Sequence, residues 1–445
     1  MISARKRIWG WFFFDWASQP YHTLLITFIF TPFMKDLLGD GSRAQAVWGY
    51  GIGAAGIVIA LLAPLLGTIA DRTGGRLRFI QLFSIFYVVG AWGLWYAVPG
   101  DFSLLFVLVS FAIGLIGMEF ATIFTNAMLP DLASKEDIGR LSGSGWGFGY
   151  VGGVMSLVIM LGLFAEGSNG KTLIGIAPVF GLDPVLREGT RAVGPFTAIW
   201  YLVFMIPFFL WVREPVKPGV LSIPAAAATA WPALRESLGR LPGQKSLMAF
   251  LASSMFYRDA LNGIYVFGGL YAAGVLGWEI RDVGIFGILA AVTGAVFAWL
   301  GGKADRRFGP RPVIFVNVTV LTLTAITVVT ISRDSIFGLV VAPESRLPDI
   351  AFYICGALIG ACGGALQAAS RTMMVHQADP ARMTEAFGLY ALSGRATAFI
   401  APLSIGIATS MSGSQQFGIT PVIALFLLGL ILLIWVRPNK NRRQA

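Results

Sequence analysis

Charged residues are scarce in this chain of 445 residues. Asp, Glu, Lys and Arg together make up 13% of it, whereas hydrophobic residues make up 56%. A soluble globular domain carries about 25% charged residues. Uncharged apolar runs such as residues 47–70 and 422–436 recur along the chain, and with their flanks they reach the length of a membrane-spanning helix. The composition therefore excludes a single soluble core and predicts an all-α membrane protein rather than a barrel of short alternating strands.

Cysteine and histidine are nearly absent. The two cysteines, Cys355 and Cys362, stand in one expected helix, which favours a packing role over a disulfide framework. The two histidines, His22 and His376, have no second ligand at metal spacing. Nor does the sequence contain the nucleotide-binding pattern G-x-x-x-x-G-K-[ST], a nucleophile elbow or paired catalytic carboxylates. We therefore expect no metal, no cofactor, no direct use of ATP and no enzymatic activity.

Twelve apolar stretches are long enough to span a bilayer. The expected spans are residues 8–34, 46–70, 77–98, 103–129, 141–164, 194–213, 247–275, 282–304, 312–331, 348–376, 385–410 and 417–436. They predict two pseudo-symmetric six-helix bundles, an N-terminal one at 1–213 and a C-terminal one at 247–445. Residues 214–246 between them hold five prolines and a short alanine run, which is typical of a linker. The sequence assigns no role to the longer loop at 166–193.

The positive charges indicate how the chain lies in the membrane. Its net charge of +10 comes from 33 Lys and Arg residues, most of which fall at the termini and in the even-numbered loops. Loops rich in Lys and Arg stay on the cytoplasmic side, so we expect both termini to be cytoplasmic. This placement of charge favours contact with the lipid bilayer over binding of nucleic acid. The basic residues 5–7 precede an apolar segment without a small-residue cleavage site, which predicts a retained first helix.

A short charged phrase occurs twice in the chain. Gly-Thr-Ile-Ala-Asp-Arg-Thr-Gly-Gly-Arg at residues 67–76 returns as Gly-Gly-Lys-Ala-Asp-Arg-Arg-Phe-Gly-Pro-Arg at 301–311, each time at the end of an apolar run. Further pairs repeat at nearly the same offset. These pairs are Asp15 with Asp259, Tyr21 with Tyr265, Gly143 with Gly388, and Gly149 with Gly394. The chain is therefore expected to consist of two related halves in parallel orientation, an architecture typical of alternating-access transporters.

The repeated phrase carries a family resemblance. Its pattern, G-x-x-A-D-R-x-G-x-R between the second and third expected helices and again between the eighth and ninth, resembles the loop motif of the major facilitator superfamily. With the twelve spans and the linker, this resemblance covers essentially the whole chain. It implies the fold of that superfamily and a central cavity lined largely by the first, fourth, seventh and tenth helices.

A narrower resemblance rests on three separate stretches. Residues 11–18, Trp-Phe-Phe-Phe-Asp-Trp-Ala-Ser, resemble the W-x-x-x-D-x-A-N opening of the "unknown major facilitator" family, which includes the yeast vacuolar amino-acid effluxer. Residues 129–153 and 363–394 are similar to that family's segments from the fourth to the fifth and from the tenth to the eleventh helix. The chain departs from the pattern at Ser18-Gln19-Pro20, where the family usually has Asn followed by small residues.

Five charged residues stand inside the expected spans, and a charge in hydrocarbon is costly enough to indicate a function. They are Asp15, Glu119, Arg258, Asp259 and Arg395. Arg258 is a candidate anchor for a substrate carboxylate, because guanidinium binds carboxylate through two parallel bonds. The alternative is a buried ion pair of Arg258 with Asp15, Glu119 or Asp259. Glu119 is the main candidate for proton coupling, with Asp15 as a second, and a permanent pair with an arginine is the alternative for Glu119.

Two further sets of residues complete the candidate site. Those expected to contact substrate in the central cavity are Asp15, Gln19, Tyr21, Asn126, Arg258, Asn262, Tyr265 and Gln367. Those expected to gate the cytoplasmic side are Gly67, Asp71, Arg72, Arg76, Gly301, Asp305, Arg306, Arg371 and Glu385. Small glycines permit close helix approach, and the Asp71 carboxylate is suited to the N-terminus of the eleventh helix near Glu385. The alternative is a plain helix stop flanked by cytoplasmic positive charge.

These features predict a secondary active transporter in a bacterial plasma membrane. It would act as a monomer and move a small solute by alternating access, with or without coupling to protons. The family resemblance implies an amino acid or a related metabolite, although one fold serves many solutes. Export of amphipathic or lipid-like compounds is a second possibility. A membrane scaffold or nutrient sensor without transport is a third, of another class.

Overall fold

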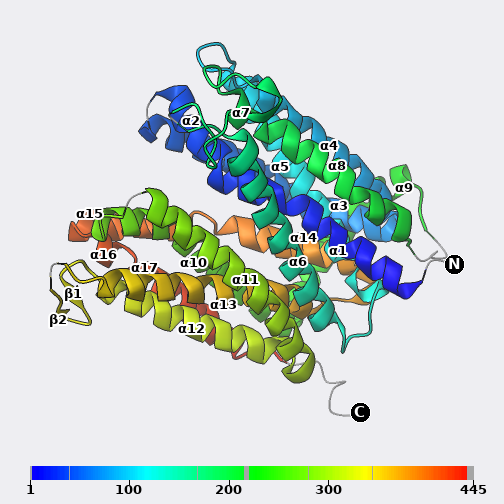
Figure 1. Ribbon diagram of the computed structural model, residues 1–445. Coiled ribbons are helices and arrows are strands. Elements are labelled where there is room, and N and C mark those ends of the chain that lie inside the picture. Colours follow the sequence, from blue (N-terminus) through cyan, green and yellow to red (C-terminus); the bar gives the residue numbers. More distant parts are fainter. Residues whose placement is uncertain are drawn as a thin grey trace. The chain divides into compact units, whose positions relative to one another are not determined.

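The computed structural model describes residues 3–39, 41–167, 169–214, 220–278, 280–342 and 344–437. These residues are almost entirely helical, and all twelve expected spans fall on helices (Figure 1). Ten of the helices described are long and apolar enough to cross a membrane. Part of the predicted linker, with Pro215, Lys217 and Pro218, and the C-terminal basic residues 440–443 lie outside the described residues.

The chain divides into two compact units. Unit 1 consists of Met1–Leu132 and Phe148–Ala228, and unit 2 of Ala133–Gly147 and Thr229–Ala445. Helix α6 contributes residues to both units, and so does α9 within the predicted linker. The division predicted from the sequence, with boundaries at 213 and 247, stays a prediction.

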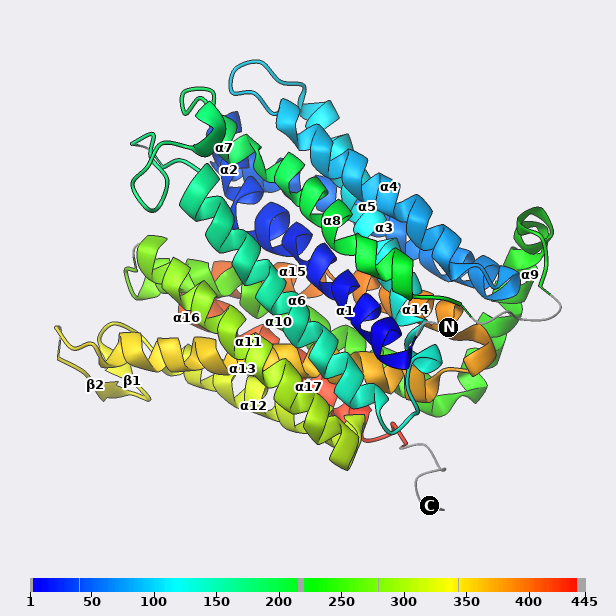
Figure 2. The same cartoon turned by 45° about the vertical axis from the view of Figure 1, so that its right-hand side comes forward.

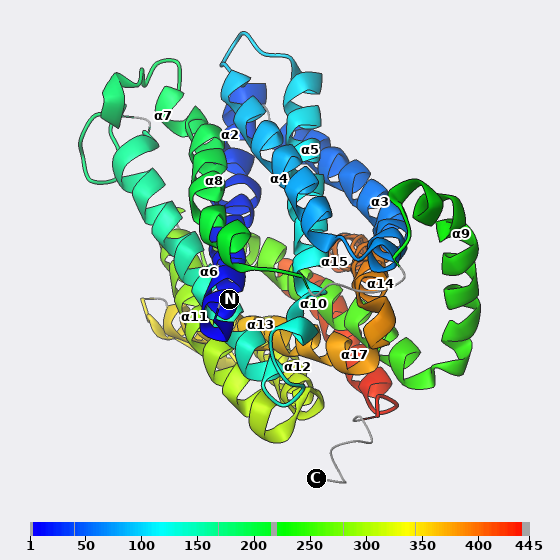
Figure 3. The same cartoon turned by 90° about the vertical axis from the view of Figure 1, so that its right-hand side faces the viewer.

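Unit 1 is built from long helices and short connecting turns. Its helices are α1 (Ala4–Pro20), α2 (Phe30–Leu38), α3 (Gly41–Thr73), α4 (Arg76–Gly93), α5 (Leu104–Asn126), most of α6 (Ile138–Ile159), α7 (Glu188–Arg191) and α8 (Val193–Trp211). The neighbours α4, α5 and α8 pack side by side (Figure 3). Ser103 caps α5 by accepting a hydrogen bond from the Phe106 N–H at 3.3 Å, which satisfies one of the free donors of its first turn.

Unit 2 repeats this pattern with one small addition. Its helices are α10 (Lys245–Val275), α11 (Ile280–Phe308), α12 (Pro310–Thr330), α13 (Leu347–Gln377), α14 (Met383–Ala396), α15 (Ile400–Ser412), α16 (Gln415–Gly418) and α17 (Thr420–Leu433). Helix α13 packs against α11 and α12, and α10 packs against α17. A two-stranded hairpin of β1 (Ser335–Ile336) and β2 (Leu339–Val340) joins α12 to α13 at one end of these helices (Figure 2). Helix α9 (Ile223–Arg240) precedes this set.

Two of the expected spans are interrupted. The first consists of α1, a π-helical segment (Tyr21–Phe28) and α2. The eleventh is divided into α14 and α15 by residues 397–399. Pro20 ends α1, and Pro402 in the first turn of α15 has no N–H to donate to Ala398. Proline thus accounts for the second interruption. In the first, the helix continues in π-helical form after Pro20 and leaves helical geometry at Ile29, whose φ is −122°. The sequence analysis had placed both inside continuous spans.

Candidate functional site

The repeated loop phrase ends a helix at a glycine with positive φ in both units, although the two glycines stand one position apart in the phrase. Gly74 follows α3 with φ +61°, and Gly309 follows α11 with φ +89°. The Gly74 N–H donates to the carbonyl of Ala70, and the Gly309 N–H donates to the carbonyl of Asp305. Such positive φ values favour glycine and end a helix abruptly. Each occurrence of the phrase therefore ends its helix in a tight turn at a glycine.

In unit 1 the phrase belongs to a buried cluster of charges, here called the Arg76 cluster. Arg76 Nη1 lies 2.8 Å from Asp131 Oδ2, and Arg76 Nη2 lies 3.7 Å from Asp71 Oδ1. Arg7 donates through Nη2 to the carbonyl of Asp131 at 2.9 Å. The cluster thus joins the α3–α4 turn to the turn after α5 and to the start of α1. The arginine fork can bridge two carboxylates in this way, whereas a lysine ammonium could not hold both in one plane.

Glu214 completes the Arg76 cluster from the end of α8. Its two carboxylate oxygens accept the backbone N–H groups of Arg76 and Leu77 at 2.8 and 3.0 Å. These are the first residues of α4, where free N–H groups and the helix dipole favour a negative charge. Burial raises the pKa of Glu214 above its usual value of 4.5, while the two N–H groups and Arg76 oppose that rise.

In unit 2 the equivalent aspartate meets the start of α6. Asp305 is 2% exposed, and its carboxyl lies where a side chain at Gly139, the second residue of α6, would have to stand. Close by, Arg306 Nε is 3.1 Å from Asp137 Oδ1. A carboxylate at a helix N-terminus is a favourable arrangement. This is the type of contact that the sequence analysis expected of Asp71 with the eleventh helix, and in unit 2 it is made by Asp305.

Arg371 is buried at the same end of unit 2. Its Nε donates to the hydroxyl of Ser142 at 2.9 Å, and its Nη2 donates to the Ser142 carbonyl at 2.7 Å. The Ser142 hydroxyl in turn donates to the carbonyl of Ala368 at 2.8 Å. Of the other gating candidates, Gly301 packs against Ala365 of α13, and Glu385 is buried in the first turn of α14.

In each unit a glycine of the predicted repeat lies against a residue of a neighbouring helix, although the two contacts are not equivalent. In unit 1, Gly149 of α6 lies against the backbone and Cβ of Asp15 in α1. In unit 2, Gly394 of α14 lies against the guanidinium of Arg258 in α10, the neighbour of Asp259. A Cβ at Gly149 would come within 3.1–3.3 Å of Asp15, and a Cβ at Gly394 would lie less than 3.0 Å from the Arg258 guanidinium, so a side chain at either position would require its neighbour to shift. Asp15 and Arg258 are therefore each fixed beside a close helix crossing.

Arg258 and Asp259 contact different partners. Arg258 stacks over the ring of Tyr390 at 4.2 Å and donates to the Tyr390 carbonyl at 3.1 Å. Asp259 accepts the N–H of Ala401 at 2.9 Å. The proposed alternative of an ion pair between these two neighbours is wrong. Among the described residues of unit 2, Arg258 has no carboxylate within ion-pair distance.

The remaining substrate candidates differ in their surroundings. Tyr21 is completely buried, and its hydroxyl donates to the carbonyl of Phe111 at 2.7 Å. Gln19 lies against Gly153, and the Tyr265 hydroxyl against Gly363. Glu119, Asn126 and Gln367 are half-buried and Asn262 is exposed. Tyr21 thus holds its own unit together, whereas the others keep some accessible surface.

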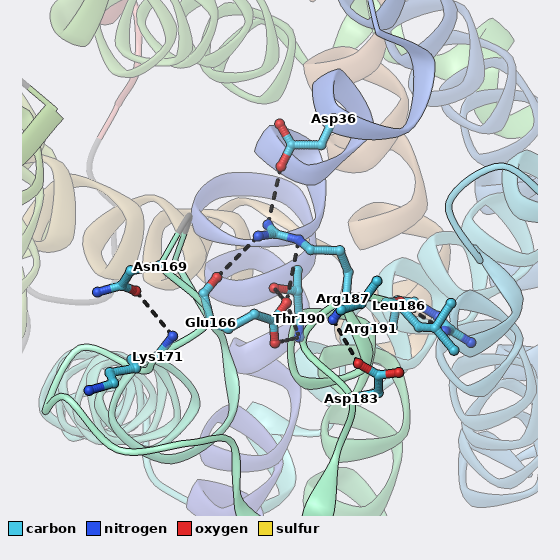
Figure 4. A network of polar contacts seen from close by, with 10 residues as sticks. Asp36, Glu166, Asn169, Lys171, Asp183, Leu186, Arg187, Thr190 and Arg191 are labelled. Carbon is cyan, nitrogen blue, oxygen red and sulfur yellow. Dashed lines mark hydrogen bonds and ion pairs between the residues drawn. The ribbon is translucent and has the colours of Figure 1, made fainter.

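The loop at 166–193, to which the sequence assigned no role, is an ordered polar network in unit 1 (Figure 4). Glu166 accepts both the N–H and the hydroxyl of Thr190, the latter at 2.8 Å. Arg187 lies between two carboxylates, with Nε 3.4 Å from Glu166 and Nη2 3.1 Å from Asp36 at the end of α2. The buried Glu166 carboxylate is thereby compensated by a cation and by hydrogen bonds. The network fixes the loop to the end of the first span.

Several residues of these clusters were missed by the sequence analysis. Asp131 stands in the Leu-Pro-Asp-Leu stretch at 129–132 that carried the family resemblance, so a signal for it was present. Ser142 stands in a second such stretch, at 139–143. Glu214 and Glu166 follow the ends of spans. A carboxylate is common at such a position, so nothing in the sequence marked these two residues as members of a cluster.

Comparison with known proteins decides the family. The family described as "Vacuole effluxer Atg22 like" matches residues 42–445. The chain belongs to this family. Over 96% of its length it is also 23% identical to the "Uncharacterized MFS-type transporter YxiO" of Bacillus subtilis, and the match covers 94% of that protein. Members of the major facilitator superfamily are transporters, so this Atg22-like chain is a membrane transporter and not an enzyme.

Other relatives and solved structures agree with this assignment. "Autophagy-related protein 22" of Coccidioides immitis is 23% identical over 69% of the Atg22-like chain, and the match spans 50% of the fungal protein. The outward-facing structure of the transporter FucP aligns with a TM-score of 0.71 at 13% identity, over 97% of this chain and 98% of that one. The proton:xylose symporter XylE gives 0.68 at 13% identity, over 98% and 96%. At these identities the structures establish the fold alone.

Proposed function

We propose that this Atg22-like transporter moves a small solute bearing a carboxylate, such as an amino acid or a related metabolite. The observation that supports this most directly is Arg258. Its guanidinium is held by Tyr390 near the middle of α10, and no carboxylate among the described residues of unit 2 neutralises it. A charge in this position needs a partner or water to persist. A solute carboxylate would supply that partner.

Substrate recognition would then involve the polar residues already placed around the two units. Asp15, in the repeat position of Asp259, is suited to the ammonium group of an amino acid, and Gln19, Asn126, Asn262, Tyr265 and Gln367 are suited to hydrogen bonds with a polar solute. Tyr21 would act indirectly, by fixing the π-helical segment of the first span.

Transport is proposed to be coupled to protons through Glu119, with Asp15 as the second candidate. Glu119 stands in α5, the fourth span, and is half-buried. A carboxylate there can change its protonation state as its exposure to water changes during the cycle. An amino-acid substrate and proton coupling are separate proposals, because either can hold without the other.

The loop phrases are proposed to form the gate of the cytoplasmic side, with both termini on that side of a bacterial plasma membrane and the protein acting as a monomer. Asp71, Arg72, Arg76 and Gly67 would serve in one unit. Gly301, Asp305, Arg306, Arg371 and Glu385 would serve in the other. The buried charges at Arg76 and Arg371 support this role. The contacts of such a cluster can form or break together, which favours two discrete conformations of the transporter over a range of intermediate ones.

The experiment that tests the substrate proposal is a thermal-shift screen of amino acids, carboxylic acids and amphipathic compounds on the purified protein. A ligand that binds the native state raises its melting temperature. We expect carboxylated solutes to raise it in the wild type and to do so less in Arg258→Lys. A shift caused only by amphipathic compounds, unchanged in Arg258→Lys, would favour the export of lipid-like molecules instead.

A further inference from the structure

The eleventh span of the transporter contains a helix N-terminus in its interior. Residues 397–399 interrupt the span, and α15 begins at Ile400. In its first turn, the Ile400 N–H donates to Thr397 and the Leu403 N–H to Phe399, while Pro402 has no N–H. Ala401 therefore carries the one N–H group of this turn for which the backbone provides no acceptor.

Asp259 supplies that acceptor from the neighbouring helix α10. Its Oδ2 accepts the Ala401 N–H at 2.9 Å. The residue is 2% exposed, and its Oδ1 is buried without a hydrogen-bond partner in the described structure. One turn further along α10, Gly263 packs on Ala401. A buried carboxylate thus points at the start of a half-helix, with one oxygen satisfied and the other open.

Among the described residues of unit 2, no cation lies within ion-pair distance of this carboxylate. Its neighbour Arg258 is held by Tyr390. Helices α15, α16 and α17 carry no ionisable side chain. The ionisable residues on the other helices that pack against α10 are Glu385, Tyr390 and Arg395 on α14, Asp349, Tyr353, Cys355, Cys362, Arg371 and His376 on α13, and Arg281, Asp282, Lys303, Asp305, Arg306 and Arg307 on α11.

Most of these groups have other partners or stand at the ends of their helices. Arg371 is bound to Ser142, and Asp349 to Arg333 and Trp278. The charged residues of α11 stand among its first three and last six residues. Arg395, in the last turn of α14, is the charged residue closest along the chain to the interruption, and Arg258 adjoins Asp259 on α10.

A proton fits this site better than a metal cation. A cation would need several oxygen ligands, and the described residues contain no group of three or more His, Cys, Asp or Glu side chains that could hold one. The positive end of the α15 dipole would also repel it. A proton needs only the open Oδ1. The Asp259 carboxylate would gain it to form a neutral carboxyl, while Oδ2 remained the acceptor of the Ala401 N–H.

We propose that Asp259 is a proton-binding site of this transporter, and that its charge controls how firmly the start of α15 is held on α10. Ionised Asp259 makes a charge-assisted bond to Ala401 and complements the helix dipole. Protonation removes the charge and leaves a weaker neutral bond, so α15 is released more easily. This inference adds a second proton site to the proposed proton coupling through Glu119.

Infrared difference spectroscopy of the purified protein in lipid tests the inference directly. As the pH is lowered, a protonated carboxyl inside the membrane gives a C=O stretching band. We expect one component of this band to be lost in Asp259→Asn and kept in Glu119→Gln, a control in the other half. A band unchanged in Asp259→Asn would overturn the inference.

Ala401→Pro provides a second test that leaves Asp259 in place. Proline is tolerated in the first turn of a helix and has no N–H for Asp259 to accept. We expect the Asp259 component to appear at a higher pH in this variant, because the ionised form has lost its donor. An unshifted component would contradict the link to α15.

The two proposals on protons can be told apart. If Asp259 titrates but flux does not respond to a pH gradient, the proposed proton coupling is wrong and the proton site at Asp259 is right. If flux follows the gradient but Asp259 does not titrate, proton coupling is right and the proton site at Asp259 is wrong.

Discussion

Arg76 Nη1 lies 2.8 Å from Asp131 Oδ2, with Asp71 on the other side of the same guanidinium at 3.7 Å. One side chain therefore joins the repeated loop phrase to the turn that follows α5. Because Glu214 also binds the backbone N–H of Arg76, the end of α8 depends on the same residue. Three connections of unit 1 are thus organised around one arginine.

Replacing Arg76 with Lys should destabilise the protein. Lysine keeps the charge but loses the planar fork that serves both carboxylates, so we expect a loss of about 1–3 kcal/mol. Thermal unfolding in detergent measures the change. Arg78→Lys is the matched control, since Arg78 is exposed two residues away. Equal losses in the two variants would show that the fork of Arg76 is not used.

Asp71→Asn should impair flux far more than folding. It removes the charge proposed to hold the closed gate, yet it is nearly isosteric at the helix end. Flux into liposomes and melting temperature, measured on the same preparation, separate the two effects. Asp305→Asn is expected to matter less, since the two halves need not use equivalent contacts equally. Normal flux in Asp71→Asn would remove the gate assignment, and a larger defect in Asp305→Asn would reverse the ranking.

Glu119→Gln should separate solute movement from the proton gradient. Exchange of solute across the membrane requires binding and conformational change but no net proton release. We therefore expect solute exchange to persist while uptake driven by a pH gradient is lost. A pH dependence of uptake like that of the wild type would show that Glu119 does not carry the proton.

Arg258→Lys should weaken the binding of carboxylated solutes by about 1–3 kcal/mol, because the ammonium cannot form two parallel bonds to a carboxylate. Calorimetry with a solute identified by the thermal-shift screen measures this directly. Equal affinities in the two proteins would assign Arg258 to the packing of α14 on α10, and Asp15 and Gln367 would be the next anchors to test.

The pH dependence of stability should reveal Glu214. Since its pKa is raised in the folded protein above its usual value of 4.5, the folded state binds more protons than the unfolded state just above that pH. Stability therefore falls as the pH rises through this window. In Glu214→Gln this contribution is absent, so unfolding measured across the window should show a flatter pH dependence. Parallel curves for the two proteins would contradict the assignment.

Much of the fold could be predicted from the sequence, because membrane helices are specified by local composition. The repeat could also be predicted, although Gly149 lies against Asp15 whereas Gly394 lies against Arg258, the neighbour of the residue that the repeat pairs with Asp15. The interruptions were not predicted. Pro20 and Pro402 stand in apolar stretches whose composition predicts a continuous helix. Proline is tolerated in membrane helices wherever neighbours satisfy the freed backbone groups.

The candidate site was predicted less completely than the fold. Asp259 illustrates the reason: in the sequence it stands next to Arg258 and suggests a local pair, but its partner is Ala401, in a helix much further along the chain. The same holds for Arg371, which binds Ser142. Contacts between distant segments depend on helix packing, which residue type and spacing do not reveal.

The central claim is that this Atg22-like protein moves a carboxylated solute across the membrane with protons. Counterflow of a labelled solute from the thermal-shift screen, in liposomes with and without an imposed pH gradient, tests it most directly. We predict exchange of the labelled solute without a gradient and net accumulation when one is imposed. Binding of the solute without any flux would contradict the claim and identify a membrane sensor instead.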